Sequence, residues 1–125
     1  IILRLLRMID YEQLLGNPLL GNIWETYVVN QVLLGKKNEL DVYFYRTHAG
    51  SEIDLVITKG LTPICSLEIK FSSTPKVTRG YREGIQTLHT KNNLIIIPKE
   101  EDYLIDKKIR VLGIRKFIEK VLPVL

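Results

Sequence analysis

Apolar residues recur at helical spacing over the first part of the chain. The spacing predicts a lead-in helix or linker over residues 1–18 and a second helix over about 18–34. Asn17 suits the N-cap of the second helix, and Pro18 suits its first turn. Because apolar side chains surround most of the girth of this helix, we expect it to be buried.

The period then changes to two, which is typical of strands. Alternating, β-branched and aromatic residues predict three strands, over residues 41–47, 51–58 and 64–71. Turn residues such as His48-Ala49-Gly50 separate these strands by short distances. Three strands joined by short turns predict an antiparallel meander.

Helical spacing returns over residues 76–90, and a wholly apolar run over 94–98 predicts a strand that is covered on both faces. Because a helix leads to this strand, we expect it to run parallel to its neighbour. An edge strand over 109–114 and a closing amphipathic helix complete the chain. The pattern predicts an α/β (α+β) fold in which helices flank a mixed sheet.

Composition narrows the class of protein further. With 125 residues, 46% hydrophobic and 26% charged, the chain fits one folded domain. Its single cysteine, Cys65, excludes an internal disulfide. The sequence contains neither the CxxC nor the HExxH spacing that would indicate a zinc site. No apolar run approaches the roughly 20 residues that span a bilayer, so we expect a soluble, cytoplasmic protein that makes no membrane contact. Since the chain opens on Ile1 without a leader pattern, we expect it to be part of a longer protein.

The net charge of +4 is compatible with a polyanionic partner but does not demonstrate one. More specific are the acidic residues within the predicted strands. Strict alternation places Glu52 and Asp54 on one face of the second strand, opposite a core face formed by Ile53, Leu55 and Ile57.

The third predicted strand carries Glu68 and Lys70 on its polar face. If the second and third strands are neighbours, Asp54 and Glu68 lie close together, with Lys70 two residues further along. Two carboxylates at such a distance repel unless a cation lies between them. Glu25 interrupts an apolar helical surface and also needs a cation or hydrogen-bond donor as partner.

Three segments in this order resemble a known family: Gly21-Asn22-Ile23-Trp24-Glu25, Glu52-Ile53-Asp54 and Leu67-Glu68-Ile69-Lys70. They resemble the PD-(D/E)xK nuclease superfamily, and in particular the domain of unknown function at the C-terminus of archaeal and bacterial AAA-type ATPases. The resemblance covers about residues 19–118 and leads us to assign residues 19–125 to a nuclease-like domain. An ExK triplet alone is common, whereas the ordered set of helix Glu, strand Asp and ExK is more specific.

The resemblance implies a restriction-endonuclease-like core of αβββαβ order. It implies that Asp54 and Glu68 bind Mg²⁺ or Mn²⁺, that Glu25 is a third, outer or direct ligand and that Lys70 orients or activates the attacking water. Phosphodiester hydrolysis or DNA binding would follow, with the ATPase domain of the parent chain as a partner. The chain holds no Walker A motif, so ATP is not expected to bind here.

Other interpretations stay open at this point. The acidic residues and Lys70 can decorate the solvent face of a hairpin, and the domain can be an inactive regulatory or oligomerisation module of the ATPase. A DNA-binding domain without metal is a further alternative. Arg46 can contact a phosphate or pair with Glu52, and three basic residues can follow a nucleic-acid backbone or face solvent: Lys76, Arg79 and Arg82.

Overall fold

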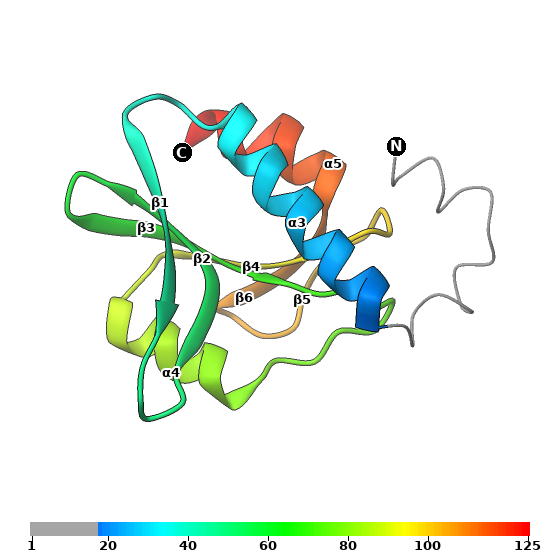
Figure 1. Ribbon diagram of the computed structural model, residues 1–125, viewed down its shortest axis with the longest axis horizontal. Helices are drawn as coiled ribbons and strands as arrows, with labels where there is room; N and C mark the ends of the chain where they lie inside the picture. The colour runs from blue at the N-terminus through cyan, green and yellow to red at the C-terminus, as the bar shows by residue number, and fades with distance from the viewer. Residues whose placement is uncertain (1–17) are drawn as a thin grey trace.

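A computed structural model describes residues 18–125 (Figure 1). The predicted lead-in over residues 1–17 and the capping role of Asn17 lie outside the described residues. Two longer helices, six strands and a closing helical segment follow one another along the chain. In order they are α3 (Pro18–Gly35), β1 (Leu40–Arg46), β2 (Glu52–Lys59), β3 (Thr62–Ile69), α4 (Arg79–Leu88), β4 (Asn92–Ile97), β5 (Asp102–Leu104), β6 (Ile109–Gly113) and α5 (Ile114–Lys116), which continues through 117–124.

All six strands form one mixed sheet of order β1-β2-β3-β4-β6-β5. The meander β1-β2-β3 is antiparallel, whereas β4 runs parallel to both β3 and β6. The predicted α/β class, the αβββαβ element order, the meander and the parallel fourth strand are therefore confirmed.

The prediction that residues 109–114 form an edge strand is wrong. β6 lies between β4 and β5, and the short strand β5 forms the edge. All three residues of β5 are exposed, so no alternation of apolar and polar residues marks it in the sequence.

Helices cover the sheet on both faces (Figure 1). On one face, α3 and the closing helical segment pack over a core that includes Trp24, Leu67 and Phe117. On the other face, α4 packs over a second core that includes Tyr81 and Ile95. No helix within residues 18–125 combines the length and apolar character needed to cross a membrane.

The expectation that α3 is buried around most of its girth is only partly correct. A single stripe of Trp24, Val28 and Val32 is buried, whereas Ile23 and Leu34 are exposed. One sheet surface lies beneath this helix, and such a surface covers only one side of a cylinder.

A β-bulge in β2 changes which residues share a face. Tyr43 pairs with Val56 and Tyr45 pairs with Ile53, so two residues of β2 lie opposite one residue of β1. Ile53 consequently packs in the α4 core, whereas Leu55 and Ile57 pack in the α3 core. The predicted shared face of these three residues is wrong because strict alternation assumes an uninterrupted ladder.

Helix α4 begins three residues later than its apolar spacing suggests. Thr78 is its N-cap, with extended backbone and a hydroxyl oxygen that accepts a hydrogen bond from the Tyr81 N–H at 3.2 Å. This hydrogen bond satisfies one of the free amide groups of the first turn. It also fixes the start of α4 close to the end of β3.

Gly80 lets the first turn of α4 approach the β1–β2 turn closely. A Cβ atom at Gly80 would lie 2.6 Å from the Gly50 carbonyl oxygen. We expect Gly80→Ala to lower the free energy of unfolding by about 1–3 kcal/mol through overpacking. Gly21→Ala is the control, because no atom lies within 4 Å of its Cβ position, and it should raise stability by about 0.5–1 kcal/mol. Urea unfolding measures both changes, and an unchanged midpoint for Gly80→Ala would contradict the close approach.

Candidate functional site

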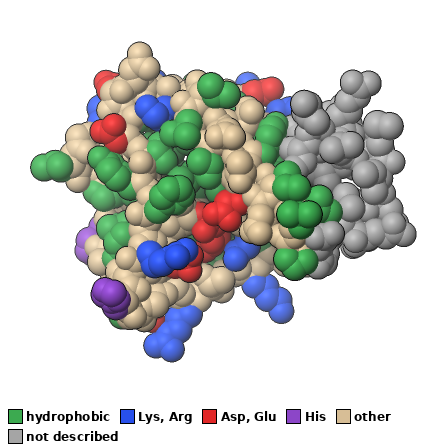
Figure 2. Space-filling view, in the orientation of Figure 1, with side chains coloured by type: hydrophobic (Ala, Val, Ile, Leu, Met, Phe, Trp, Pro, Cys, Tyr) green, Lys and Arg blue, Asp and Glu red, His purple; other side chains and the backbone are tan. Residues whose placement is uncertain are grey.

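Acidic side chains gather where β2 and β3 stop pairing, beside α3. Figure 2 shows a patch of carboxylates near the centre of this face with basic side chains next to it. A pocket of about 370 Å³ lies here, with Glu25, Glu52 and Asp54 among its lining residues and Arg46 at the same site. The meander and α3 thus bring together residues that are distant in the sequence.

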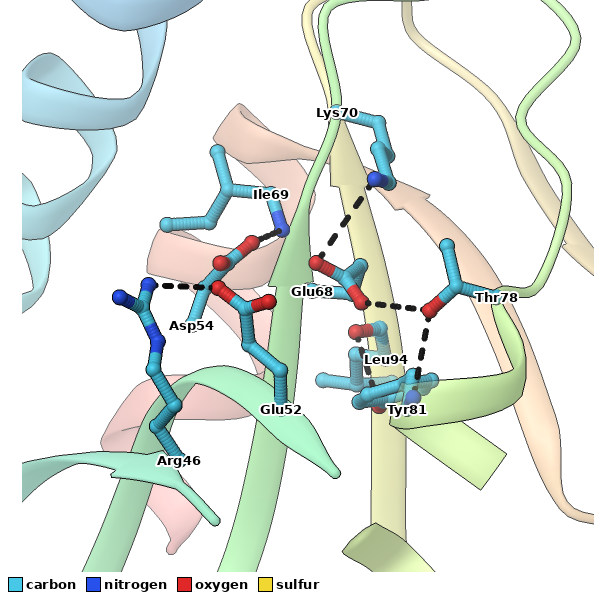
Figure 3. A network of polar contacts seen from close by, with 9 residues as sticks. All are labelled: Arg46, Glu52, Asp54, Glu68, Ile69, Lys70, Thr78, Tyr81 and Leu94. Carbon is cyan, nitrogen blue, oxygen red and sulfur yellow. Dashed lines mark hydrogen bonds and ion pairs between the residues drawn. The ribbon is translucent and has the colours of Figure 1, made fainter. Parts of the chain in front are cut away.

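Asp54 lies at the bulge of β2 and is half-buried. Its Oδ2 atom accepts a hydrogen bond from the Ile69 N–H at 2.8 Å (Figure 3). The pairing between β2 and β3 begins with Leu55 opposite Leu67. The Asp54 carboxylate therefore binds the β3 backbone just beyond the paired region, which fixes its position beside Glu68.

Glu68 is the buried member of the site, with 5% of its surface exposed. The Thr78 hydroxyl donates a long hydrogen bond of 3.5 Å to Oε2, and the Lys70 Nζ atom lies 3.9 Å from Oε1 (Figure 3). Both contacts are at the outer limit of their kind, so they hold the carboxyl group only loosely.

The pKa of Glu68 is raised from its ordinary value of 4.5 to about 9, chiefly by burial and further by a hydrogen bond with Asp54 and by the charge of Asp54. Lys70 opposes the rise in pKa but does not cancel it. Burial and the neighbouring carboxylate thus favour the protonated form of Glu68 in the folded protein.

Glu25, on α3, lines the same pocket as Glu52 and Asp54. Burial raises its pKa, and the charges of Asp54 and Glu52 raise it further, whereas Lys70 and Arg46 lower it. Glu25 is thus within electrostatic range of the cluster, as the sequence predicted.

Arg46 pairs with Glu52 across the hairpin, with 2.7 Å between Nη2 and Oε1 (Figure 3). This confirms the interpretation that the two residues form an ion pair. Because both side chains are largely exposed, such a pair contributes at most about 1 kcal/mol to stability. The guanidinium can therefore exchange its partner at small cost.

The structure brings Asp54, Glu68 and Lys70 together, with Glu25 nearby. Among residues 18–125, no three carboxylate, imidazole or thiol side chains are grouped closely enough to hold a metal ion. Mg²⁺ does not require three, because it binds through one or two carboxylates and keeps several waters. The paired carboxylates of Asp54 and Glu68 fit such an ion, which would also relieve their mutual repulsion.

The three basic residues expected to follow a nucleic-acid backbone lie along or just before α4. Lys76 precedes the helix and is exposed. Arg79 pairs with Glu83 at 2.8 Å, and Arg82 pairs with Asp106 at 2.8 Å. None of the three lines the carboxylate pocket. The solvated helix face therefore describes their positions in the structure, and nucleic-acid contact stays a prediction.

Two site residues escaped the sequence analysis. Glu52 lines the pocket together with Asp54, whereas the sequence indicated only a position on the polar strand face and a possible pair with Arg46. Thr78 contacts Glu68 because it caps α4. A threonine just before a helical pattern is an N-cap signal, so Thr78 was accessible from the sequence once the helix start was placed correctly.

Relatives of the chain carry little functional description. The uncharacterized proteins Rv2008c of Mycobacterium tuberculosis and Mb2031c of Mycobacterium bovis are each 35% identical to it over 101 residues. These alignments cover 80% of the chain but 22% of each relative, so the chain spans about a fifth of their length. No solved structure matches the chain. Residues 20–117 match the family described as "Domain of unknown function (DUF4143)", and because this match covers most of the chain, the chain belongs to that family.

Proposed function

We propose that Asp54 and Glu68 bind Mg²⁺ or Mn²⁺, and that this domain is a nuclease-related module of the PD-(D/E)xK type that acts on or binds DNA. One observation carries the proposal: two carboxyl groups from adjacent strands lie in hydrogen-bond contact at a half-buried site, next to a lysine. Carboxyl groups that serve only the stability of a fold rarely lie in contact with each other, because two negative charges at that distance repel and lower stability. Functional sites accept that loss of stability.

The roles of the residues follow from their positions. Asp54 and Glu68 would hold the ion, with the Ile69 carbonyl as a third protein ligand. A bound divalent ion stabilises negative charge on a phosphate and lowers the pKa of a bound water. Lys70 places a positive charge beside the same site, where it orients the attacking water and the phosphate. Glu25 lines the same pocket as Asp54 and would accept a hydrogen bond from a water of the ion.

Metal binding is tested by thermal unfolding of the chain at pH 8 with Mg²⁺, Mn²⁺ or Ca²⁺. An ion that binds only the folded state stabilises that state by about 2.7 kcal/mol when its free concentration is about 100 times its Kd. We expect the wild type to gain several degrees in Tm and Asp54→Asn to gain none. Asp41→Asn is the matched control, since Asp41 is an exposed residue of β1 outside the pocket. Equal gains in all three proteins would contradict a site at Asp54.

A second candidate is a catalytically inactive module that regulates or oligomerises the ATPase of a longer parent chain. It is favoured by exposed apolar side chains, since Leu34 is 82% and Phe44 74% exposed. Large apolar side chains at the surface are typical of interaction sites when they form patches. A domain that shows no cation effect and no cleavage of DNA would favour this module over the nuclease.

We further propose a cytoplasmic location and an ATPase domain in the same parent protein. The single buried Cys65 suits a reducing compartment, where disulfides are rare. The length of the curated relatives leaves room for other domains, since the chain matches only 22% of each. Sequencing the parent gene on the N-terminal side tests the second point directly, because an ATPase domain there would carry a Walker A motif.

A further inference from the structure

A broad hollow lies at the C-terminal end of α4, outside the carboxylate pocket. It has a volume of about 900 Å³ and extends from the end of α4 to the loop between β5 and β6. Its charged and titratable lining residues are Arg82, His89, Lys91, Asp106, Lys107 and Lys108. Four cations face one carboxylate, which leaves a surplus of three positive charges.

Most of this positive charge is uncommitted. Asp106 already pairs with Arg82, with 2.8 Å between Oδ2 and Nη1. Its Oδ1 atom accepts hydrogen bonds from the backbone N–H groups of Lys108 and Ile109 at 2.8 and 3.1 Å. Within residues 18–125, Lys91, Lys107 and Lys108 have no ion-pair partner. The carbonyl end of α4 contributes only about half a negative charge. The hollow therefore keeps a positive potential.

The two loops that carry the lysines are tied together at their base. Buried Asn93 donates hydrogen bonds through Nδ2 to the Thr90 carbonyl at 3.1 Å and to the Lys108 carbonyl at 3.3 Å. Ser66 donates to the Oδ1 atom of Asn93 at 2.8 Å. Because these bonds hold both loops in place, the lysines are presented from a preorganised base, which reduces the entropy lost on binding.

His89 adds a second sign that this surface is more than a solvated helix end. It ends α4 in the left-handed conformation, at φ 56°, where glycine is favoured. A histidine in this conformation is strained relative to glycine. Its imidazole lines the hollow beside Lys91. Strain of this kind is characteristic of functional positions.

We propose that this hollow binds the sugar-phosphate backbone of a nucleic acid. It is open and its lysines are exposed, which suits a chain of phosphates better than a small enclosed ligand. The ten residues of α4 span about 15 Å, and its N-cap Thr78 contacts Glu68 at the other end. A duplex along α4 would thus place the hollow about four base pairs from the carboxylate site. Only this spacing rests on the proposed function, because the affinity of the hollow does not require cleavage.

The proposal is tested by fluorescence anisotropy of a labelled DNA duplex in EDTA, at two salt concentrations. The variant carries Lys91→Gln, Lys107→Gln and Lys108→Gln. A control variant with the same loss of charge carries Lys36→Gln, Lys37→Gln and Lys59→Gln, three lysines that line neither this hollow nor the carboxylate pocket. We expect the first variant to lose affinity about tenfold or more and to show a shallower salt dependence, since fewer counterions are released. The control variant should stay within about twofold of wild type on the same grounds.

Equal losses in the two variants would overturn the proposal, because only net charge would then matter. Competition by polyglutamate as strong as by unlabelled DNA would also overturn it, in favour of an acidic protein partner. Wild type should bind the duplex in EDTA, where no divalent ion is free. If it does so while divalent ions leave its Tm unchanged, the proposed nuclease function fails and the proposal for the hollow stands.

A single substitution separates binding from folding. His89→Gly removes the strained conformation and should raise Tm or leave it unchanged, while it weakens binding of the duplex. Thr87→Gly, also at an exposed position near the end of α4, is the control for lost helix stability. Unchanged DNA affinity in His89→Gly would show that the imidazole takes no part in binding the duplex.

Discussion

Replacement of Glu68 by glutamine is expected to raise the free energy of unfolding at pH 8 by up to about 4 kcal/mol relative to wild type, in EDTA. In the folded protein Glu68 keeps its proton until the pH passes about 9, whereas in the unfolded chain it loses the proton near its ordinary pKa of 4.5. The folded pKa is raised. Wild-type stability is therefore greatest below the unfolded pKa and declines by about 1.4 kcal/mol per pH unit as the pH rises toward 9.

Glutamine is neutral in both states and its amide can donate the hydrogen bond to Asp54 that protonated Glu68 donates. Urea unfolding at pH 5, 6, 7 and 8 should thus give a steep decline for wild type and a flatter profile for Glu68→Gln. Glu119→Gln is the control, because Glu119 is exposed in the closing helical segment. If Glu68→Gln and wild type show the same slope, the pKa of Glu68 is not raised in the folded protein.

Replacement of Lys70 by glutamine is expected to reduce Mg²⁺-dependent nicking of plasmid DNA by a factor of about 100 or more. The Lys70 ammonium lies 3.9 Å from Glu68 Oε1 and is partly exposed, so it can reach both the site and a substrate. Removal of one charge-stabilising donor from an active site costs about 10²–10³ in kcat. Nicked circles counted over time on a gel give the rate.

Lys70→Gln should be stabilised by Mg²⁺ as wild type is, because Lys70 is not a ligand in the proposed metal site. Lys59→Gln is the matched control, since Lys59 is an exposed lysine at the end of β2 that lines neither the carboxylate pocket nor the hollow beside α4. We expect it to nick at a rate close to wild type. If Lys70→Gln nicks DNA as fast as wild type, Lys70 does not orient the attacking water or the phosphate.

Much of the fold could be predicted from the pattern of side chains. The meander, the parallel strand β4 and the αβββαβ order all follow from changes of hydrophobic period and from short turns. The edge strand β5 could not be predicted, because its three residues are exposed and carry no periodic pattern. The one-sided burial of α3 also escaped prediction, since an apolar helix surface does not reveal how much of it a sheet will cover.

The candidate site was predictable only in part. The closeness of Asp54, Glu68 and Lys70 follows from strand alternation and from the order of motifs. The bulge in β2 does not follow, because it depends on the pairing of β2 with β1, yet it occurs where Asp54 leaves the strand ladder. The contact of Thr78 with Glu68 depends on where α4 begins, which apolar spacing places only to within a few residues.

An anomalous difference map from crystals soaked in Mn²⁺ tests whether Asp54 and Glu68 bind a divalent ion, and it requires no substrate. Density touching the carboxylates of both Asp54 and Glu68, and absent from crystals of Asp54→Asn, is the predicted outcome. A map with no manganese peak between these two side chains at millimolar Mn²⁺, in crystals where both remain open to solvent, would contradict it.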